Sequence, residues 1–320
     1  MLALPADEIT ERDNRPSHRP YRASVAKLEA LTPHFTRVTF TGPDIQFFGT
    51  DGLDQRIKLV LPLDGRISDI GVDDEQTQLD GSWYTRWREL PDAARNPIRT
   101  YTVRAVRPEL SEIDVDFVAH GDGGPAAKWL LSAVIGDELV IVGPDGRSLH
   151  SAGGIDFHPG TATDILLAGD ETAAPAICSI LESLAPGIRA RAFIEVESIA
   201  DALPIVTLAD VTVTWIGRED EAAGGRTLES AVRDWVAENR TVVSREITTE
   251  LQVLDDVNVD IELLWDAPAT VEGNSFYAWL AGEATIIKSL RRFLVTDTGI
   301  DRKRVSFMGY WRRGRAEPQS

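Results

Sequence analysis

The sequence is short of cysteine, of long apolar runs and of positive charge, and each shortage excludes a class of protein. Its single cysteine, Cys178, leaves no internal disulfide and no cysteine ligands for an iron–sulfur cluster. No run of about 18 apolar residues and no basic, apolar leader is visible, so we expect neither a membrane span nor a signal peptide. With 33 basic against 51 acidic residues, the net charge of −18 disfavours nucleic acid and anionic membranes as partners. We expect a cytoplasmic monomer.

The composition is that of a globular protein with two domains. The chain has 320 residues, of which 43% are hydrophobic and 26% charged, and a domain averages about 150 residues. Residues 1–20 contain three prolines and no periodic pattern, which predicts a flexible N-terminal tail. Residues 21–150 and 160–320 differ in pattern and are predicted to be separate domains.

The first domain, residues 21–150, reads as antiparallel β-structure. Its segments are short, rich in Val, Ile, Thr and Phe, and often alternate between apolar and polar residues. Glycine and proline turns separate them. Closure into a barrel would remove exposed strand edges, so we predict a β-barrel with strands at 22–30, 36–42, 57–62, 99–106, 112–119 and 138–142.

The second domain, residues 160–320, reads as a parallel α/β sheet. An apolar strand at 164–168, a helical pattern at 173–184 and a strand at 190–196 form a βαβ unit. Further strands are predicted at 211–217 and 276–282, and further helices at 227–238 and 284–295. The stretches 64–96 and 240–272 fit neither pattern and are interpreted as insertions.

The motif RTYTVR at residues 99–104 is the most informative stretch of the barrel. In a strand, Arg99, Tyr101 and Val103 lie on one face, and Thr100, Thr102 and Arg104 on the other. An aromatic ring, a hydroxyl and a cation at one strand end suit a flavin, which needs a stacking surface, a ring-edge hydrogen bond and positive charge for its pyrophosphate. The hexapeptide alone fits an exposed strand equally well.

A second motif, DFVAHGDGGPAAKW at residues 116–129, runs from a strand through a glycine-rich turn into a helix. Backbone amides at a helix start can hold a pyrophosphate, and glycine allows its close approach. A turn of this kind is by itself usually only a turn. Its position shortly after RTYTVR favours the phosphate-binding interpretation.

Together these and four further segments resemble the siderophore-interacting proteins, which are FAD-dependent ferric-siderophore reductases within the ferredoxin-reductase-like superfamily. The resemblance spans about 21–314 and lapses over the two insertions. The segments are RTYTVR, DFVAHGDGGPAAKW, GPDG at 143–146, LAGDETAAPAI at 167–177, YAWLAGE at 277–283 and GYWRRG at 309–314.

The resemblance implies site residues at the matching positions, with Tyr101 stacked on the flavin and Thr102 at its edge. Neither donor-side segment is a full GxGxxG fingerprint. The implied FAD-binding residues are Arg99, Tyr101, Thr102, Val103, Arg104, Asp116, Val118, His120, Gly123, Gly124, Pro125, Ala126 and Trp129. On the electron-donor side they are Gly169, Asp170, Glu171, Thr172, Ala281, Gly282 and Glu283. The cations for a ferric siderophore are Lys58, Arg147 and Arg312.

The activity that the resemblance implies is an NAD(P)H:ferric-siderophore reductase that passes electrons through FAD to Fe(III) and releases Fe(II). A ferredoxin is an alternative donor. No acid–base catalyst, nucleophile or resident metal is expected. Two alternatives stay open: a general flavin or ferric reductase of the same superfamily, and a siderophore-binding protein without catalytic activity.

Overall fold

The computed structural model describes residues 12–119, 124–221, 225–248 and 275–314, with 250, 252, 254, 257, 259, 262, 264–268 and 273 between the last two ranges. The chain divides into two compact units. Of the described residues, the first unit holds 12–31 and Phe35–Ile155, and the second holds Thr32–His34 and those from 156 to 314.

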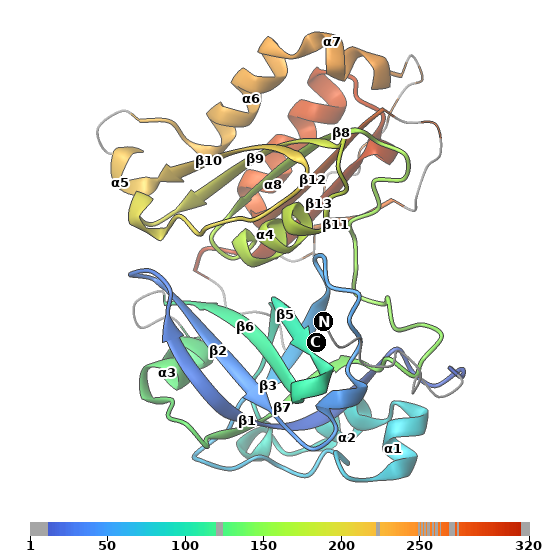
Figure 1. The fold of residues 1–320 in the computed structure, drawn as a ribbon, viewed down its shortest axis with the longest axis vertical. Coiled ribbons are helices and arrows are strands. Elements are labelled where there is room, and N and C mark those ends of the chain that lie inside the picture. The colour runs from blue at the N-terminus through green and yellow to red at the C-terminus, as the bar shows by residue number, and fades with distance from the viewer. Residues whose placement is uncertain are drawn as a thin grey trace, which may run out of the picture. The chain divides into compact units, whose positions relative to one another are not determined.

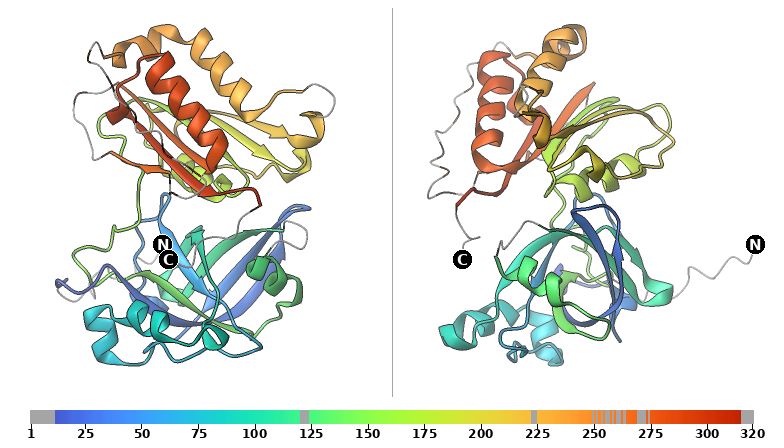
Figure 2. Two further views of the ribbon diagram at one scale, coloured as in Figure 1. Left: turned by 180° about the vertical axis from the view of Figure 1, so that it is seen from behind. Right: turned by 90° about the vertical axis from the view of Figure 1, so that its left-hand side faces the viewer.

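The first unit is the predicted antiparallel barrel (Figures 1 and 2). Its sheet has the order β4-β3-β7-β1-β2-β6-β5. The two outer strands β4 and β5 follow one another in the chain and close the sheet: Val103 N–H donates to Gln55 O (3.0 Å), and Arg104 N–H donates to Asp114 O (2.9 Å). The strands are β1 (His18–Ala30), β2 (Phe35–Thr41), β3 (Arg56–Val60), β4 (Ile98–Thr102), β5 (Ala105–Arg107), β6 (Glu112–Val118) and β7 (Glu138–Pro144).

The barrel core follows from the alternation of apolar residues along the strands. Val38 and Phe40 in β2 and Ile113, Val115 and Phe117 in β6 are at most 1% exposed and belong to one cluster. Residues two apart in a strand point to the same face, which is why an alternating pattern fills the interior. Helix α3 (Gly124–Ser132) packs against the same cluster through Ala126, Trp129 and Leu130.

The first insertion is helical and covers part of the outside of the barrel. It contains α1 (Glu75–Asp80) and α2 (Trp83–Glu89). Trp83 and Trp87 form a second apolar cluster with barrel residues that include Val60, Ile98, Val140 and Val142, and the Trp87 Nε1–H donates to Asn96 O (2.9 Å). These tryptophans therefore anchor the insertion on the barrel wall.

The later part of the predicted tail, residues 13–20, is paired with other parts of the first unit. Strand β1 begins at His18. Before it, Asp13 N–H donates to Arg147 O (2.9 Å), Leu149 N–H donates to Asp13 O (2.9 Å), and Ser148 Oγ donates to Arg15 O (2.8 Å). The backbone from Asp13 onward is thus paired with the segment that follows β7, a pairing that the proline-rich local sequence does not reveal.

The second unit is built on a sheet of order β10-β9-β8-β12-β13-β11, in which β11 alone runs antiparallel. The chain first extends the sheet from β8 to β10 and then returns to the other side of β8, so its direction switches between β8 and β12. The strands are β8 (Asp164–Asp170), β9 (Arg189–Val196), β10 (Asp210–Gly217), β11 (Trp265–Asp266), β12 (Phe276–Glu283) and β13 (Val305–Trp311).

Helices cover both faces of this sheet, as expected of a parallel α/β fold. Helices α6 and α8 pack on one face and α4 on the other (Figure 1). Within the described ranges, no helix is long and apolar enough to cross a membrane. The helices are α4 (Ala174–Ser183), α5 (Arg218–Glu221), α6 (Leu228–Glu238), α7 (Arg240–Val243) and α8 (Ala284–Arg291), which continues as a π-helix over Arg292–Asp297.

Candidate functional site

The RTYTVR segment bends at the point where the barrel closes. Its first part, β4, pairs with β3, and its continuation, β5, pairs with β6. Tyr101 lies opposite Ile57 in the inward-facing row and packs on the barrel core, with its ring centroid 4.5 Å from that of Phe117. Arg99 donates to Ile98 O (2.7 Å). Tyr101 keeps part of its surface exposed at the bend, so it can still stack on a ligand.

Asp116 anchors the outer side of the bend. Its carboxylate is 2% exposed and receives two hydrogen bonds from Arg37, at 2.7 and 2.9 Å. The Nε atom of Arg104 lies 3.6 Å from Asp116 Oδ2, the oxygen that also accepts the longer hydrogen bond from Arg37. Asp116 therefore fixes two arginines at the strand end. The contribution of Arg37 was not predicted; it follows from the β2–β6 register, which places Arg37 opposite Asp116.

A row of aromatic rings ties helix α3 to the same strand end. Trp129 lies between Phe40 and Phe117, with ring centroids 6.1 and 5.5 Å away, and Phe117 contacts Tyr101. The helix begins at Gly124, whose φ of +77° favours glycine and at which an added Cβ would meet open space. The first turn of α3 carries the unpaired N–H groups of a helix start.

These residues fit an FAD. The half-buried Tyr101 ring offers a stacking surface, Arg104 offers a cation, and the start of α3 offers phosphate-binding amides. Thr102 and Val103 are buried, 5% and 1% exposed, and shape the bend. Of the other predicted residues, Val118 ends β6 and Pro125 and Ala126 lie in the first turn of α3, whereas His120 and Gly123 lie outside the described residues.

Lys58 lies on the outer face of β3. The register places it beside Thr100 of β4 and Val142 of β7, and the next row on that face contains Arg56, Thr102 and His18. In the described part of the chain, no hydrogen bond or ion pair involves the Lys58 ammonium group. A half-exposed lysine without a carboxylate partner is available to an anionic ligand.

Arg147, by contrast, is held in an ion pair. Its guanidinium donates to both oxygens of Asp145 (3.0 and 2.8 Å) and lies 4.4 Å from the ring centre of Phe47. Asp145 is 1% exposed and also lies 3.3 Å from Arg19 and 3.6 Å from Arg15. The position at which the family resemblance suggested a substrate cation thus forms a compact structural cluster, and substrate binding by Arg147 stays a prediction.

The Asp145 cluster predicts acid sensitivity of the barrel. Burial favours the protonated form, but hydrogen bonds from Arg147 and the charges of Arg147 and Arg19 outweigh it and hold the pKa of Asp145 below its ordinary 3.8. The stabilisation is therefore present above pH 3.8 and is lost as the pH falls through the lower folded-state value. Asp145→Asn removes the buried partner of Arg19, which keeps its hydrogen bond to Asp44 (3.1 Å), and should lower the free energy of unfolding at pH 7 by about 3 kcal/mol.

The measurement is denaturant unfolding of the wild type and Asp145→Asn between neutral and strongly acidic pH. The difference in unfolding free energy should shrink once Asp145 is protonated in the native wild type. A difference that is the same at every pH would contradict the role of the Asp145 charge.

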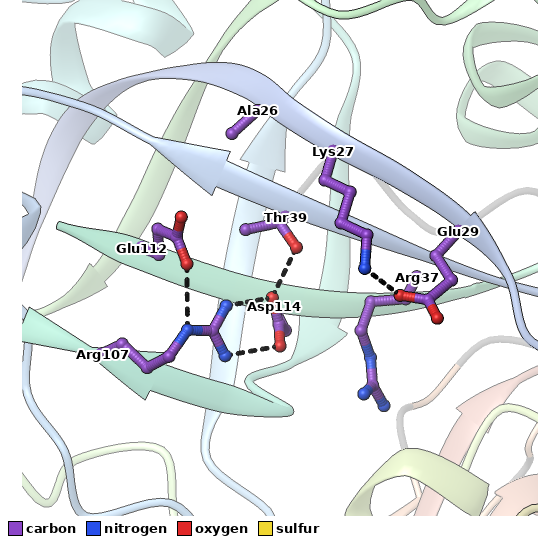
Figure 3. A pocket seen from close by; sticks show the side chains of 8 residues that line it. All are labelled: Ala26, Lys27, Glu29, Arg37, Thr39, Arg107, Glu112 and Asp114. Atoms are coloured by element: carbon purple, nitrogen blue, oxygen red, sulfur yellow. Dashed lines mark hydrogen bonds and ion pairs between the residues drawn. The ribbon is translucent and has the colours of Figure 1, made fainter. Parts of the chain in front are cut away.

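The barrel also carries a cavity of about 500 Å³ on its outer wall, lined by residues of β1, β2, β5 and β6. Its charges neutralise one another (Figure 3): Arg107 contacts Glu112 and Asp114, Thr39 donates to Asp114, and Lys27 pairs with Glu29. These pairs account for the charged groups drawn in Figure 3 apart from Arg37, which binds Asp116. The charged groups of the cavity thus pair with one another, and Arg37 connects the cavity to the candidate site.

In the second unit, the predicted donor-side residues gather at the carboxyl ends of β8 and β12, beside the switch point where parallel sheets commonly bind ligands. Asp170 ends β8 and is 3% exposed. Burial and the charge of Glu171 raise the pKa of Asp170 to about 6. Gly169 allows close packing of the two strands, because an added Cβ would lie 2.5 Å from Ala281 O.

Glu171 is not available for direct binding, because Arg218 holds it. The Arg218 guanidinium donates to both Glu171 oxygens (2.7 and 2.6 Å) and lies 3.5 Å from Glu195 and 3.2 Å from Glu197. Thr172 donates two hydrogen bonds to Asp170 Oδ1, one from its backbone N–H (2.9 Å) and one from its Oγ1 hydroxyl (2.5 Å). Arg218 was not predicted as a site residue, since it follows the third strand, 47 residues from its partner.

An antiparallel barrel, followed along the chain by a parallel sheet whose strand order switches between β8 and β12, is the fold of ferredoxin reductases. The ferredoxin reductase of carbazole 1,9a-dioxygenase shows the same fold at a TM-score of 0.54 and 16% identity, over 92% of this chain and 70% of that one. Family models match both units: the siderophore-interacting FAD-binding domain over residues 24–148 and the siderophore-interacting protein over 162–314. The chain belongs to the siderophore-interacting protein family.

Individual relatives agree with this membership. An uncharacterised protein of Mycobacterium tuberculosis is 33% identical over 93% of both chains. The ferric vibriobactin reductase ViuB of Vibrio cholerae is 27% identical over 93% of this chain and 91% of its own. The siderophore-interacting protein SipS from Aeromonas hydrophila superposes with a TM-score of 0.62 at 26% identity, over 94% of each chain.

Proposed function

We propose that this protein is an FAD-dependent ferric-siderophore reductase that takes electrons from NAD(P)H and releases iron as Fe(II). The observation that carries the proposal is the strand end where the Tyr101 ring, Arg104 and the start of α3 are held together, in a chain whose two units both match siderophore-interacting family models. The similarity to ferric vibriobactin reductase supports the same activity.

The barrel residues have distinct parts in holding FAD. The Tyr101 ring would stack on the isoalloxazine ring, and Arg104, which lies beside Asp116, would offer its positive charge to the pyrophosphate. The N–H groups of Gly124 and Ala126, on either side of Pro125, which has none, would bind its phosphate oxygens, because a helix start combines unpaired N–H groups with a positive dipole end. When bound, FAD supplies the exchange between a two-electron donor and a one-electron acceptor.

The substrate is an anionic ferric chelate with oxygen ligands. Such hard donors hold Fe(III) better than Fe(II), so reduction alone loosens the complex and no covalent bond of the siderophore has to break. Lys58 of the first unit and Arg312 of the second each offer a positive charge to such an anion, in an otherwise acidic chain. Each pair of electrons from the donor converts two Fe(III) to two Fe(II).

The test is reconstitution with FAD followed by anaerobic turnover. The purified protein is mixed with FAD, NADH or NADPH and a ferric siderophore, and Fe(II) is trapped by a colorimetric chelator. We expect a bound flavin spectrum and donor-dependent release of Fe(II). A protein that quenches on adding ferric siderophore but takes up no flavin and oxidises no donor would be a binding protein instead.

The same assay addresses the finer parts of the proposal. We propose a reduced nicotinamide as donor in place of a ferredoxin, a cytoplasmic location, which suits a chain with one buried cysteine, and a monomeric enzyme. Running the assay with NADH, NADPH and reduced ferredoxin in parallel ranks the donors, and size-exclusion chromatography with light scattering measures the assembly state.

A further inference from the structure

The carboxylate of Asp170 collects hydrogen bonds from three strand ends of the second unit. Its Oδ1 accepts from Thr172, in the turn after β8. Its Oδ2 accepts from the backbone N–H of Glu283 at the end of β12 (2.7 Å) and from Nε1–H of Trp311 at the end of β13 (2.7 Å). Both oxygens are thus used, and two of the donors come from the far side of the switch point.

The chain is shaped to allow this contact. Gly282 has a φ of +149°, and a Cβ added there would lie 2.6 Å from Asp170 Oδ2. The β12–β13 register also shifts between Gly282 and Glu283. Glycine at this position lets the backbone of β12 approach the carboxylate closely enough to donate to it.

The carboxylate of Glu283, at the end of β12, also accepts hydrogen bonds from several segments of the second unit. It caps α8 by accepting from Thr285 N–H (2.8 Å) and Ile286 N–H (3.1 Å), and its other oxygen accepts from Arg313 N–H (3.4 Å). Asp170 therefore holds the residue before Arg312, and Glu283 holds the residue after it. Buried carboxylates thus hold both chain neighbours of Arg312, Trp311 through its indole N–H and Arg313 through its backbone N–H.

We infer that Asp170 and Glu283 are positioning residues that fix Arg312 for the anionic ferric chelate. The sequence had predicted instead that these two residues contact the electron donor directly. The inference rests on the proposed function, because it assigns the substrate contact to Arg312. A guanidinium on a fixed backbone loses less conformational entropy when it binds an anion than one on a mobile segment. Loosening either anchor should weaken chelate binding without disturbing the flavin.

The experiment is Asp170→Asn in the FAD-loaded protein. The amide has the same shape but only one acceptor oxygen, so whichever way it turns, two of the N–H and O–H donors lose their acceptor. We expect KM for the ferric chelate to rise about tenfold, a loss equivalent to about 1.4 kcal/mol of binding. The flavin spectrum should stay as in the wild type.

Asp164→Asn is the matched control, because it makes the same change at the opposite end of β8, where Asp164 pairs with the exposed Arg189. It should leave KM within twofold of the wild type.

Trp311→Phe removes one hydrogen-bond donor from the Asp170 carboxylate and keeps an aromatic ring. It should raise KM for the ferric chelate, as Asp170→Asn does. This variant tests the inference even where Asp170→Asn folds poorly.

A double-variant cycle separates positioning from general loosening. Arg312→Gln should raise KM strongly in the wild type and have little further effect beside Asp170→Asn, because the two act through one contact. Equal effects of Arg312→Gln in both backgrounds, or an unchanged KM in Asp170→Asn and Trp311→Phe, would overturn the inference.

Hydrogen exchange of residues 305–314 gives a readout independent of activity. The amides of this segment should exchange faster in Asp170→Asn than in Asp164→Asn. If the wild type releases no Fe(II), the proposed function fails. The comparison of hydrogen exchange between the two variants still decides whether Asp170 anchors residues 305–314. Exchange that is unchanged in Asp170→Asn would refute this anchoring role.

Discussion

Replacing Tyr101 by alanine should weaken FAD binding about 10- to 100-fold. The ring supplies the stacking surface at the barrel closure, where an aromatic contact contributes about 0.5–1.5 kcal/mol beyond the area it buries, and the lost area adds to this. The dissociation constant of FAD, measured by the change in flavin fluorescence on titration, is the quantity to compare. Tyr101→Phe keeps the ring and should stay within about threefold of the wild type.

A matched control separates flavin binding from folding. Tyr84 also stacks on another ring, that of Trp87 (5.6 Å), but in the helical insertion. Tyr84→Ala therefore removes an aromatic contact of the same kind from the same unit, and should leave FAD affinity unchanged. If both alanine variants bind FAD as the wild type does, the RTYTVR strand does not seat the flavin.

Reversing the charge of Lys58 should lower kcat/KM for an anionic ferric siderophore by about 10- to 100-fold at low salt. The Lys58 ammonium group has no carboxylate partner in the described part of the chain, so Lys58→Glu places a negative charge directly where the chelate is to bind. The loss should shrink as salt is added, because screening weakens interactions between exposed charges. Reduction of a neutral quinone should be unaffected.

Lys27→Glu is the control for Lys58→Glu. It makes the same change of charge on another barrel strand, where Lys27 pairs with Glu29 (2.5 Å). Equal losses in the two variants would mean that net charge, and not a local site, governs the reaction. A Lys58→Glu variant that reduces ferric siderophore normally would favour a general flavin reductase.

The fold could be predicted because its information is local. Alternation in β2 and β6 and the long apolar strands of the second unit are visible within a few residues, and both sheets form as expected. Strand β13 was missed: the GYWRRG segment was recognised only as a motif, although Val305–Trp311 forms a strand beside β12.

The candidate site could be predicted only in part, because its contacts depend on register. Nothing local shows that Arg37 faces Asp116, or that Trp311 donates to Asp170 from 141 residues away. The Asp145–Arg147 pair is local, but the same spacing suits a free cation and an ion pair, and only the burial of Asp145 decides between them. The residue types therefore indicated the kind of site, whereas the strand pairing determined which side chains are in contact.

The most direct test of the central claim is a single turnover without donor. The FAD-loaded protein is reduced, kept free of oxygen and mixed with excess ferric siderophore, while the visible flavin band and trapped Fe(II) are recorded together. We predict that the flavin band returns as Fe(II) appears, with two Fe(II) formed for each flavin. A flavin that stays reduced in the presence of ferric siderophore would contradict the account.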